Sequence, residues 1–357
     1  MRTHDLAGRK LVGSLVRIPP LSLRKKVPMH CCANKAILTL VLGLLMSGLG
    51  IAQPVPALVA VGKIALPNTQ GRIDHMAVDL SRTRLYVAEL GNGSVDVVDL
   101  TTSKVIRRLT GLKSPQGIAY DQQADILAVA SDGDGSLRLY AGGDLAPRGV
   151  VMLGDDADNI RIDPRNGHVI VGYGSGGIAV IDPGRAQRLH DIPLPAHPES
   201  FRQEGNRVFV NVPGANQIAV IDIDAGKVIA TWKPSGLSSN FPMILDNAGH
   251  LAAVFRGQNR LALFDPSSGN VTATLDTCGD ADDLFFDEKR SRFYVSCGSG
   301  SVEVIAAEAS GLRALARVQT FSGARTSLFV PELDRLFVAE RAGILGSSAD
   351  IAILRPS

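Results

Sequence analysis

A block of about 42 residues repeats along this chain, and a repeat of that length restricts the fold more than any other feature. Each block contains an apolar stretch that ends in an acidic residue, and these anchors recur at intervals of 41 to 44 residues. The acidic anchors are Asp79, Asp121, Asp163, Glu204, Asp246 and Asp287, and a seventh copy ends at Pro331 without the acid. A period this regular indicates one supersecondary unit, repeated and stacked.

Each anchor is followed by further short segments rich in Val, Ile and aromatic residues. In the first block these are RLYVAE (84–89), SVDVVDL (94–100) and a weaker KVIRRL (104–109). The segments lack the 3.6-residue period of a helix and are bounded by Gly, Asn, Asp and Pro, which is typical of strands. Four antiparallel strands per block are the blade of a β-propeller.

The two ends of the repeat array predict how the ring closes. The seventh block has only three strands, and an orphan strand, LVAVGKIALP (58–67), precedes the first block. We expect the orphan strand to complete the seventh blade, because closure leaves no exposed sheet edge. The sequence therefore predicts an all-β fold, a single seven-bladed β-propeller of four-stranded antiparallel blades over residues 53–357, with the last blade closed by the N-terminal strand.

Two segments carry a resemblance to a known repeat. RLYVAELGNGSVDVVDLTTSKVI (84–106) and RVFVNVPGANQIAVIDIDAGKVIAT (207–231) each run from a strand through a Gly/Asn turn into an apolar strand ending in Asp, and then into K-V-I. Both resemble the repeat of the YVTN-type β-propeller family, and the resemblance covers roughly residues 58–357. It implies the propeller fold but little about activity, because members include binding modules and lactonase-like enzymes.

The segment before the repeats has the features of an export signal. Residues 36–51 form the longest apolar run, with Lys35 before it and the small residues Gly50 and Ala52 at its end. This pattern predicts a secretory signal peptide within a leader of residues 1–52, and hence a periplasmic or extracellular protein. Met29 would give a leader of ordinary length and is the alternative start. A retained membrane anchor is the alternative interpretation, but the run is short for a span, so we expect none after cleavage.

The leader also carries the basic excess of the chain. Residues 1–52 contain eight Lys and Arg and one Asp, so the net charge of +2 for the whole chain leaves about −5 on the remainder. A mildly acidic ring without a basic run argues against nucleic-acid binding. The sequence also contains no haem or nucleotide motif, no H-E-x-x-H and no G-x-S-x-G elbow. We expect a monomer.

Two cysteines remain outside the leader, Cys278 and Cys297. Cys278 precedes the first strand of the sixth block and Cys297 ends its second strand, which places both at the same face of the ring. In an oxidising compartment such a pair predicts a disulfide, and two unpaired thiols are the alternative.

The first strand of each block is expected to line the central channel, so the residues at its start should surround one channel mouth. Five positions before the anchors stand Asp74, Gln116, Asp158, Glu199, Phe241, Asp282 and Thr326. One position later stand His75, Gly117, Asn159, Ser200, Pro242, Asp283 and Ser327. The acidic members are candidate ligands for Ca²⁺ or another divalent cation, which prefers oxygen: Asp74, Asp158, Glu199, Asp282 and Asp283. Carboxylates that cap the turn and face solvent are the alternative.

His75 is the most suggestive single residue, because it follows a carboxylate in GRIDH (71–75). Such a His can act as a general base or metal ligand, and a His that packs against the next blade is the alternative. Arg325 approaches the same face from the neighbouring seventh blade, and an arginine pair there would suit a carboxylate or sugar acid. The candidate ligand-binding residues are Arg72, Asp74, His75, Asn159 and Arg325.

Symmetry separates structural acids from functional ones. A third-strand Asp recurs at one position of four blocks, as Asp99, Asp182, Asp222 and Asp265, and we interpret it as a turn cap. The run GYGSGG (172–177) is likewise predicted to be a hairpin. Two classes of function then compete. The favoured one is a scaffold that binds a protein or small molecule at the channel mouth, and the alternative is a lactonase-like hydrolase or other enzyme using a cation or the His/Arg group.

Overall fold

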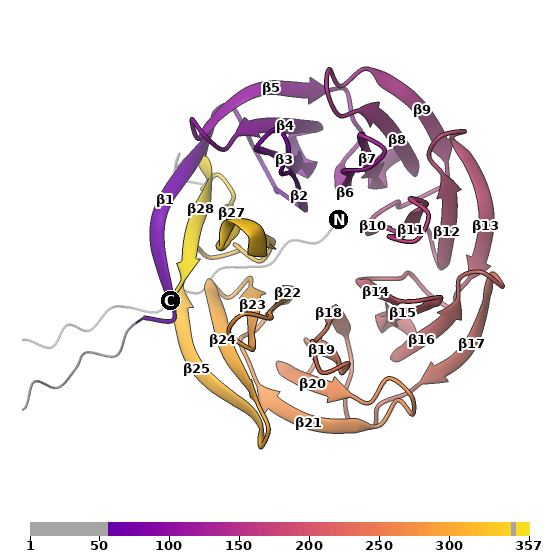
Figure 1. Cartoon of the computed structure of the whole chain (residues 1–357), viewed down its shortest axis with the longest axis vertical. Helices are drawn as coiled ribbons and strands as arrows, with labels where there is room; N and C mark the ends of the chain where they lie inside the picture. The colour runs from indigo at the N-terminus through magenta and orange to yellow at the C-terminus, as the bar shows by residue number, and fades with distance from the viewer. Residues whose placement is uncertain (1–55, 344–347) are drawn as a thin grey trace, which may run out of the picture. The chain divides into compact units, whose positions relative to one another are not determined.

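The computed structural model describes residues 56–343 and 348–357, and these form seven four-stranded antiparallel sheets arranged as blades around a channel (Figure 1). The predicted seven-bladed propeller is confirmed. The leader of residues 1–52, with its predicted signal peptide and the alternative start at Met29, lies outside the described residues. Within the described ranges no helix has the length and apolar character needed to cross a membrane.

Each blade consists of four consecutive strands except the last. Blade 1 is β2 (Met76–Asp79), β3 (Arg84–Glu89), β4 (Ser94–Asp99) and β5 (Lys104–Thr110); blade 2 is β6 (Pro115–Asp121), β7 (Ile126–Ser131), β8 (Ser136–Ala141) and β9 (Pro147–Met152); blade 3 is β10 (Ile160–Ile162), β11 (Val169–Tyr173), β12 (Gly177–Asp182) and β13 (Gln187–Pro193); blade 4 is β14 (Phe201–Glu204), β15 (Arg207–Val212), β16 (Gln217–Asp222) and β17 (Lys227–Trp232); blade 5 is β18 (Asn240–Leu245), β19 (Leu251–Phe255), β20 (Arg260–Phe264) and β21 (Val271–Asp276); blade 6 is β22 (Ala281–Asp287), β23 (Arg292–Cys297), β24 (Ser301–Glu308) and β25 (Gly311–Gln319). Four single 3₁₀ turns lie between second and third or first and second strands: η1 (Leu90–Asn92), η2 (Asp132–Asp134), η3 (Pro213–Ala215) and η4 (Pro331–Leu333).

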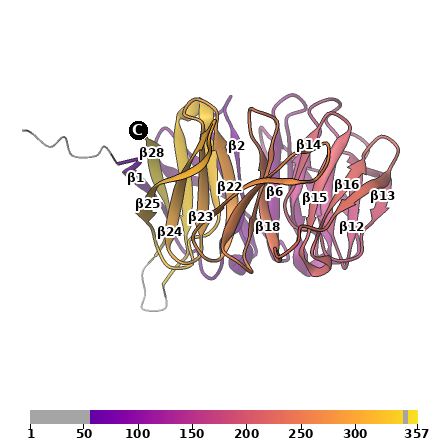
Figure 2. The same cartoon turned by 90° about the horizontal axis from the view of Figure 1, so that it is seen from below.

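Blade 7 joins the two ends of the ring. It contains β26 (Ser327–Val330), β27 (Arg335–Glu340) and β28 (Ala349–Pro356), and its outermost strand is β1 (Leu58–Leu66). β1 pairs antiparallel with β28 from Leu58 opposite Pro356 to Leu66 opposite Ala349. In Figures 1 and 2, β1 lies beside β28 at the outer edge of this blade. The predicted closure by the N-terminal strand is confirmed.

Recurrent carboxylates shape the turns. At the end of the first strand, Asp79 Oδ1 accepts the backbone N–H of Arg82 at 3.0 Å, and Asp121 Oδ1 accepts that of Gln123 at 2.8 Å. The predicted third-strand caps all accept an N–H from two residues further on, as Asp99, Asp182, Asp222 and Asp265 do. These bonds replace ladder partners that the turn removes, so the repeated acids are structural. The run GYGSGG is the hairpin between β11 and β12.

The apolar core is divided among the blade interfaces. Ile64 and Leu66 of β1, both fully buried, pack in one cluster with Leu85 and Val87 of blade 1. Similar clusters lie between other neighbouring blades, so each blade buries its faces against the next. The first strands are thereby held around the axis, where their starting residues face one another.

Candidate functional site

A backbone pattern repeated in blades 1, 3 and 4 holds the mouth residues in equivalent positions. Asp74 N–H donates to the Ala88 carbonyl at 2.8 Å, and Ala88 N–H donates back to the carbonyl of His75 at 3.0 Å. Asp158 and Asn159 make the same pair of bonds with Gly172 in blade 3. Glu199 and Ser200 make it with Asn211 in blade 4. Equivalent positions in sequence are therefore equivalent positions in the ring.

Blade 7 departs by one residue from the sequence alignment, which placed Thr326 and Ser327 in the ring. The strands pair Val330 with Arg335, as Asp79 pairs with Arg84 in blade 1. Val330 therefore takes the anchor position, because Pro331 already begins the turn η4. The ring positions of blade 7 belong to Arg325 and Thr326, so Arg325 is the counterpart of the acidic Asp74.

Most of the predicted site residues line one narrow part of the channel, which we call the constriction. It has a volume of about 30 Å³, room for about two water molecules. Its predicted members are Arg72, Asp74, His75, Asp158, Asn159, Glu199, Asp282 and Asp283. Gly117 of blade 2 keeps the ring tight, because a Cβ there would lie 1.7 Å from the Asp158 carbonyl oxygen.

His75 sits between two carboxylates of the constriction. Its Nε2 lies 3.7 Å from Asp74 Oδ1 and its Nδ1 lies 3.9 Å from Asp283 Oδ1. Burial acts to lower the pKa of His75, but these two carboxylates outweigh it and raise the pKa above 6.5. Burial raises the pKa of Asp74 to about 7, against the opposing charges of His75 and Arg72. The pKa of each group therefore depends on the charge of the other.

A second histidine, His197, which the sequence analysis did not identify, precedes blade 4 and contacts residues of blade 3. His197 Nδ1 lies 2.7 Å from the Gly174 carbonyl and 3.3 Å from Asp156 Oδ2, and its Nε2 lies 4.0 Å from Asp158 Oδ2. Burial acts to lower the pKa of His197, but the nearby Asp158 carboxylate and the hydrogen bond to the Gly174 carbonyl outweigh it and raise the pKa to about 9. For Glu199, burial and then repulsion from Asp158 raise the pKa to about 8.

Arg256 is a basic residue of the channel mouth that the sequence analysis did not identify. It follows β19 directly, and its guanidinium carbon lies 3.6 Å from the centre of the Phe241 ring. Its Nε donates to the Ala281 carbonyl at 2.6 Å, and its Nη2 forms an ion pair with Asp282. Arg256 therefore covers the aromatic member of the ring and neutralises one of its acids.

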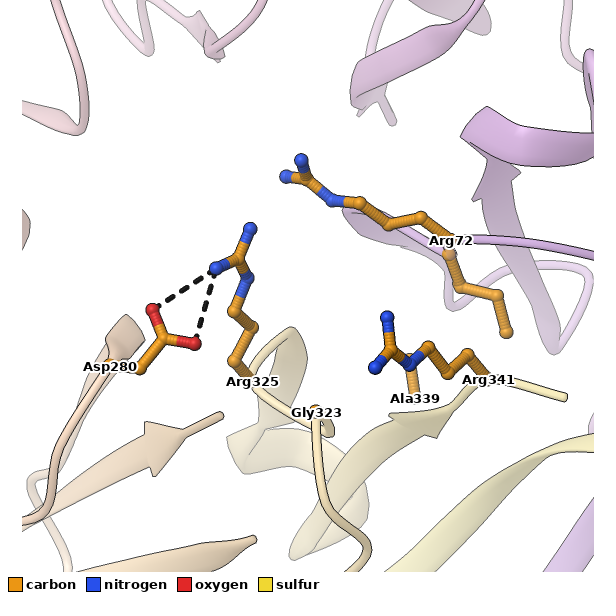
Figure 3. Close-up of a pocket in the computed structure, with 7 residues that line it drawn as sticks. Arg72, Asp280, Gly323, Arg325, Ala339 and Arg341 are labelled. Carbon is orange, nitrogen blue, oxygen red and sulfur yellow. Dashed lines mark hydrogen bonds and ion pairs between the residues drawn. The ribbon is translucent and has the colours of Figure 1, made fainter. Parts of the chain in front are cut away.

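Next to the constriction, residues of blades 6, 7 and 1 form a pocket of about 150 Å³, which we call the rim pocket. Three arginines line it, Arg72, Arg325 and Arg341, with Asp280 as the acid among its lining residues. Figure 3 shows all three arginines projecting toward the same opening, with Arg325 bonded to Asp280 at 3.1 and 3.2 Å. Arg72 belongs to both the rim pocket and the constriction, so the two spaces adjoin.

Arg72 and Arg325 are held by neighbouring carboxylates, whereas Arg341 is not. Arg72 Nη2 lies 2.8 Å from Asp74 Oδ2, and Arg325 Nε lies 3.0 Å from Asp282 Oδ2. Arg341 is exposed and forms no ion pair with any described residue. Its guanidinium crosses Gly323, where a Cβ would come within 3.0 Å of Arg341 Nε.

The five predicted metal ligands share the constriction but are interleaved with cations. Asp74 contacts Arg72, Asp282 contacts Arg256 and Arg325, and Asp283 accepts the backbone N–H of Ser327 at 2.7 Å. Over the described residues no group of three or more His, Cys, Asp and Glu side chains is arranged to hold a metal ion. The cation site therefore stays a prediction from the sequence.

A disulfide joins Cys278 to Cys297 in blade 6, with Cα atoms 5.9 Å apart. Closing a loop with 19 residues of sequence separation reduces the entropy of the unfolded chain and contributes about 3 kcal/mol. We expect the Cys278→Ser, Cys297→Ser double variant to melt ~8 °C lower than the wild type. Reductant should lower the melting temperature of the wild type similarly and leave the variant unchanged. Two free thiols in the denatured, unreduced protein lacking residues 1–52 would contradict the bridge.

Comparisons with known proteins support the fold alone. No known protein family and no curated protein matches the chain. Of the solved structures 1817 chains match, so the architecture is too widely shared to indicate a function. A chain of the Kuenenia stuttgartiensis hydrazine synthase has a TM-score of 0.68 at 16% identity and covers 83% of this chain and 99% of its own. A chain from a crystal structure of the mitotic checkpoint complex has a TM-score of 0.73 at 12% identity and covers 90% and 99%.

Proposed function

We propose that the protein is an exported propeller that binds a small hydroxylated carboxylate, of the sugar-acid class, at its channel mouth. The observation that carries this proposal is the convergence of Arg72, Arg325 and Arg341 on one pocket of about 150 Å³. Guanidinium groups bind carboxylates through paired N–H donors, and three from different segments surround a ligand rather than a flat surface. Export is proposed from the apolar leader and from the predicted signal peptide.

Two arginines of the rim pocket, Arg72 and Arg325, form ion pairs with neighbouring carboxylates, whereas Arg341 forms none with the described residues. Arg72 and Arg325 are fixed by Asp74 and Asp280, which reduces the side-chain entropy lost when a ligand binds. Arg341 has no carboxylate partner among the described residues, so a ligand carboxylate can bind it without first breaking an ion pair. Arg341 is therefore expected to contribute most to affinity.

The acid of the rim pocket, Asp280, suits the hydroxyl groups of such a ligand. Asp280 at the pocket wall is half exposed and can accept hydrogen bonds from hydroxyl groups, as carboxylates in sugar sites do. A ligand with one carboxylate and several hydroxyls would thus satisfy the arginines and the acid together. A purely apolar carboxylate would leave the polar wall without partners, which is costly.

The geometry favours binding over hydrolysis by a lactonase-like enzyme. A general base must reach the substrate within hydrogen-bonding distance. His75 is the candidate base, but its two ring nitrogens face Asp74 and Asp283, and it lines the constriction and a deeper cavity of about 320 Å³. It does not line the rim pocket, where the ligand would sit.

The test compares galacturonate with neutral galactose by isothermal titration calorimetry. Galacturonate should bind the wild type, and galactose should bind at least tenfold more weakly. Arg341→Gln should weaken galacturonate binding at least tenfold without changing the melting temperature, because the side chain is exposed. The matched control is Arg148→Gln, an exposed arginine on the outer strand β9, which should bind as the wild type does. Equal binding of the two sugars, or an unaltered Arg341→Gln variant, would contradict the proposal.

A further inference from the structure

Deeper in the channel, two arginines break the symmetry of the ring. Two positions before each anchor, the first strands carry apolar residues in five blades: Ala77, Ala119, Ile244, Phe285 and Leu328. In blades 3 and 4, which are neighbours, the same position is Arg161 and Arg202. A structural feature of a propeller repeats from blade to blade, so a charged pair confined to two adjacent blades calls for a local explanation.

Both arginines line a cavity of about 320 Å³, which we call the inner cavity. Its other walls are largely apolar and include Ile118, Phe285 and Leu328. Its volume lies within the range of small-molecule sites, whereas the constriction beside it admits only water. Mainly apolar walls with a few convergent polar groups are the usual form of such sites.

The two guanidinium groups have neutral partners only. Arg161 Nη1 donates to the Ile160 carbonyl at 2.6 Å, and Arg202 Nη1 donates to the Phe201 carbonyl at 2.8 Å and to Ser200 Oγ at 3.3 Å. Neither makes an ion pair with a carboxylate in residues 56–343 or 348–357, in contrast to Arg256 and Arg325 in the mouth. Each guanidinium has five N–H donors, so most of them are left to face the cavity.

Charge in this cavity is poorly compensated. Burial, and then repulsion from Arg161, lower the pKa of Arg202 well below its usual range, and burial lowers the pKa of Arg161 to about 10. The acid Asp283 lines the cavity as well, but it already accepts the Ser327 N–H and faces His75. Two like charges held deep in the ring lower stability unless an anion lies between them.

We propose that the inner cavity binds an organic anion, a carboxylate or sulfonate with an apolar body. The anionic group lies against Arg161 and Arg202, and the body packs against Phe285 and Leu328. This site is distinct from the rim pocket in both position and chemistry, because apolar residues make up most of its lining, with Asp283 as the acid among them. Its ligand would gain from two desolvated arginines, where charge-assisted hydrogen bonds are strong.

The experiment is calorimetric titration of the purified protein with naphthalene-2-carboxylate and with its neutral isostere naphthalene-2-carboxamide. The carboxylate should bind, and the amide should bind at least tenfold more weakly. Arg161→Met and Arg202→Met should each weaken carboxylate binding at least tenfold, while Arg148→Gln on the outer strand β9 should leave it unchanged. The melting temperature of the unliganded Met variants should equal or exceed that of the wild type, because a like-charge repulsion is removed.

Three results would overturn the proposal. They are no binding of the carboxylate at millimolar concentration, equal binding of carboxylate and amide, and wild-type affinity in both Met variants. If a Met variant fails to fold, Arg161→Lys and Arg202→Lys take its place. Lysine keeps the charge but not the planar fork, so both should retain measurable carboxylate binding at reduced affinity. Affinity equal to the wild type in both Lys variants, together with equal binding of the amide, would exclude recognition by the guanidinium pair.

Discussion

Deletion of residues 58–66 is expected to lower the melting temperature by about 15 °C or more. The deleted strand β1 carries Leu58, Ile64 and Leu66, which are 0 to 3% exposed. Each buried aliphatic side chain contributes about 1.5–3 kcal/mol, so the loss is on the order of 6 kcal/mol before the unpaired edge of β28 is counted. That is comparable to the whole stability of an ordinary domain. Differential scanning calorimetry measures the shift.

Point variants within the same strand separate packing from chain length. Ile64→Ala should cost about 2–5 kcal/mol, because Ile64 is 0% exposed and packs against blade 1. Val61→Ala is the matched control, since Val61 is 43% exposed, and it should change stability by at most about 0.5 kcal/mol. An unchanged melt after deletion of 58–66, or equal effects of the two point variants, would show that β1 does not close the ring.

Stability is expected to fall as the pH rises from 5 to 9, through the charges of the channel mouth. The folded protein keeps a proton on Glu199 up to about pH 8, whereas the unfolded chain releases it near 4.5. Asp74, with a pKa of about 7, acts in the same direction. The stability that charged His197 contributes is fully present below 6.5 and is lost as the pH rises through about 9. In this window the folded state binds more protons, so alkaline conditions favour unfolding.

Glu199→Gln should remove part of this dependence. Glutamine keeps the shape and stays neutral, so the variant should melt like the wild type at pH 5 and ~5 °C higher at pH 9, a gain of about 2 kcal/mol. Glu288→Gln is the matched control, because Glu288 is exposed, and its melting curve should follow the wild type at both pH values. A Glu199→Gln variant that is no more stable than the wild type at pH 9 would refute the assignment.

The fold could be predicted because its determinants are local and repeated. The anchor acids make turns within a few residues of themselves, so each block specifies its own hairpins without reference to the others. Repeat alignment then converts a position in the block into a position in the ring. That is why Arg72, Asp74, His75 and Asn159 could be placed in one channel mouth before the structure was known.

The repeat alignment placed the anchor of blade 7 one residue too late, at Pro331 instead of Val330. Pro331 ends an apolar run as the acids do, but its fixed φ begins a 3₁₀ turn, so Val330 ends the strand. Arg256 and His197 were missed for a different reason, because they reach the mouth from the turn after a second strand and from a loop rather than from the first strands. Arg161 and Arg202 were visible as charges inside apolar strands, but which way such a side chain points depends on the assembled ring.

The pairing of β1 with β28 also sets the order of events in folding. It places Leu58 opposite Pro356, so the contact links residues that are 298 positions apart in the sequence. Bringing such distant segments together is entropically slow, and the blades between them can pair locally long before it happens. Until then the edge of β28 is open to a strand from another molecule. The rate of ring closure, rather than the strength of any blade, therefore sets how long the newly made chain is exposed to strand exchange and aggregation.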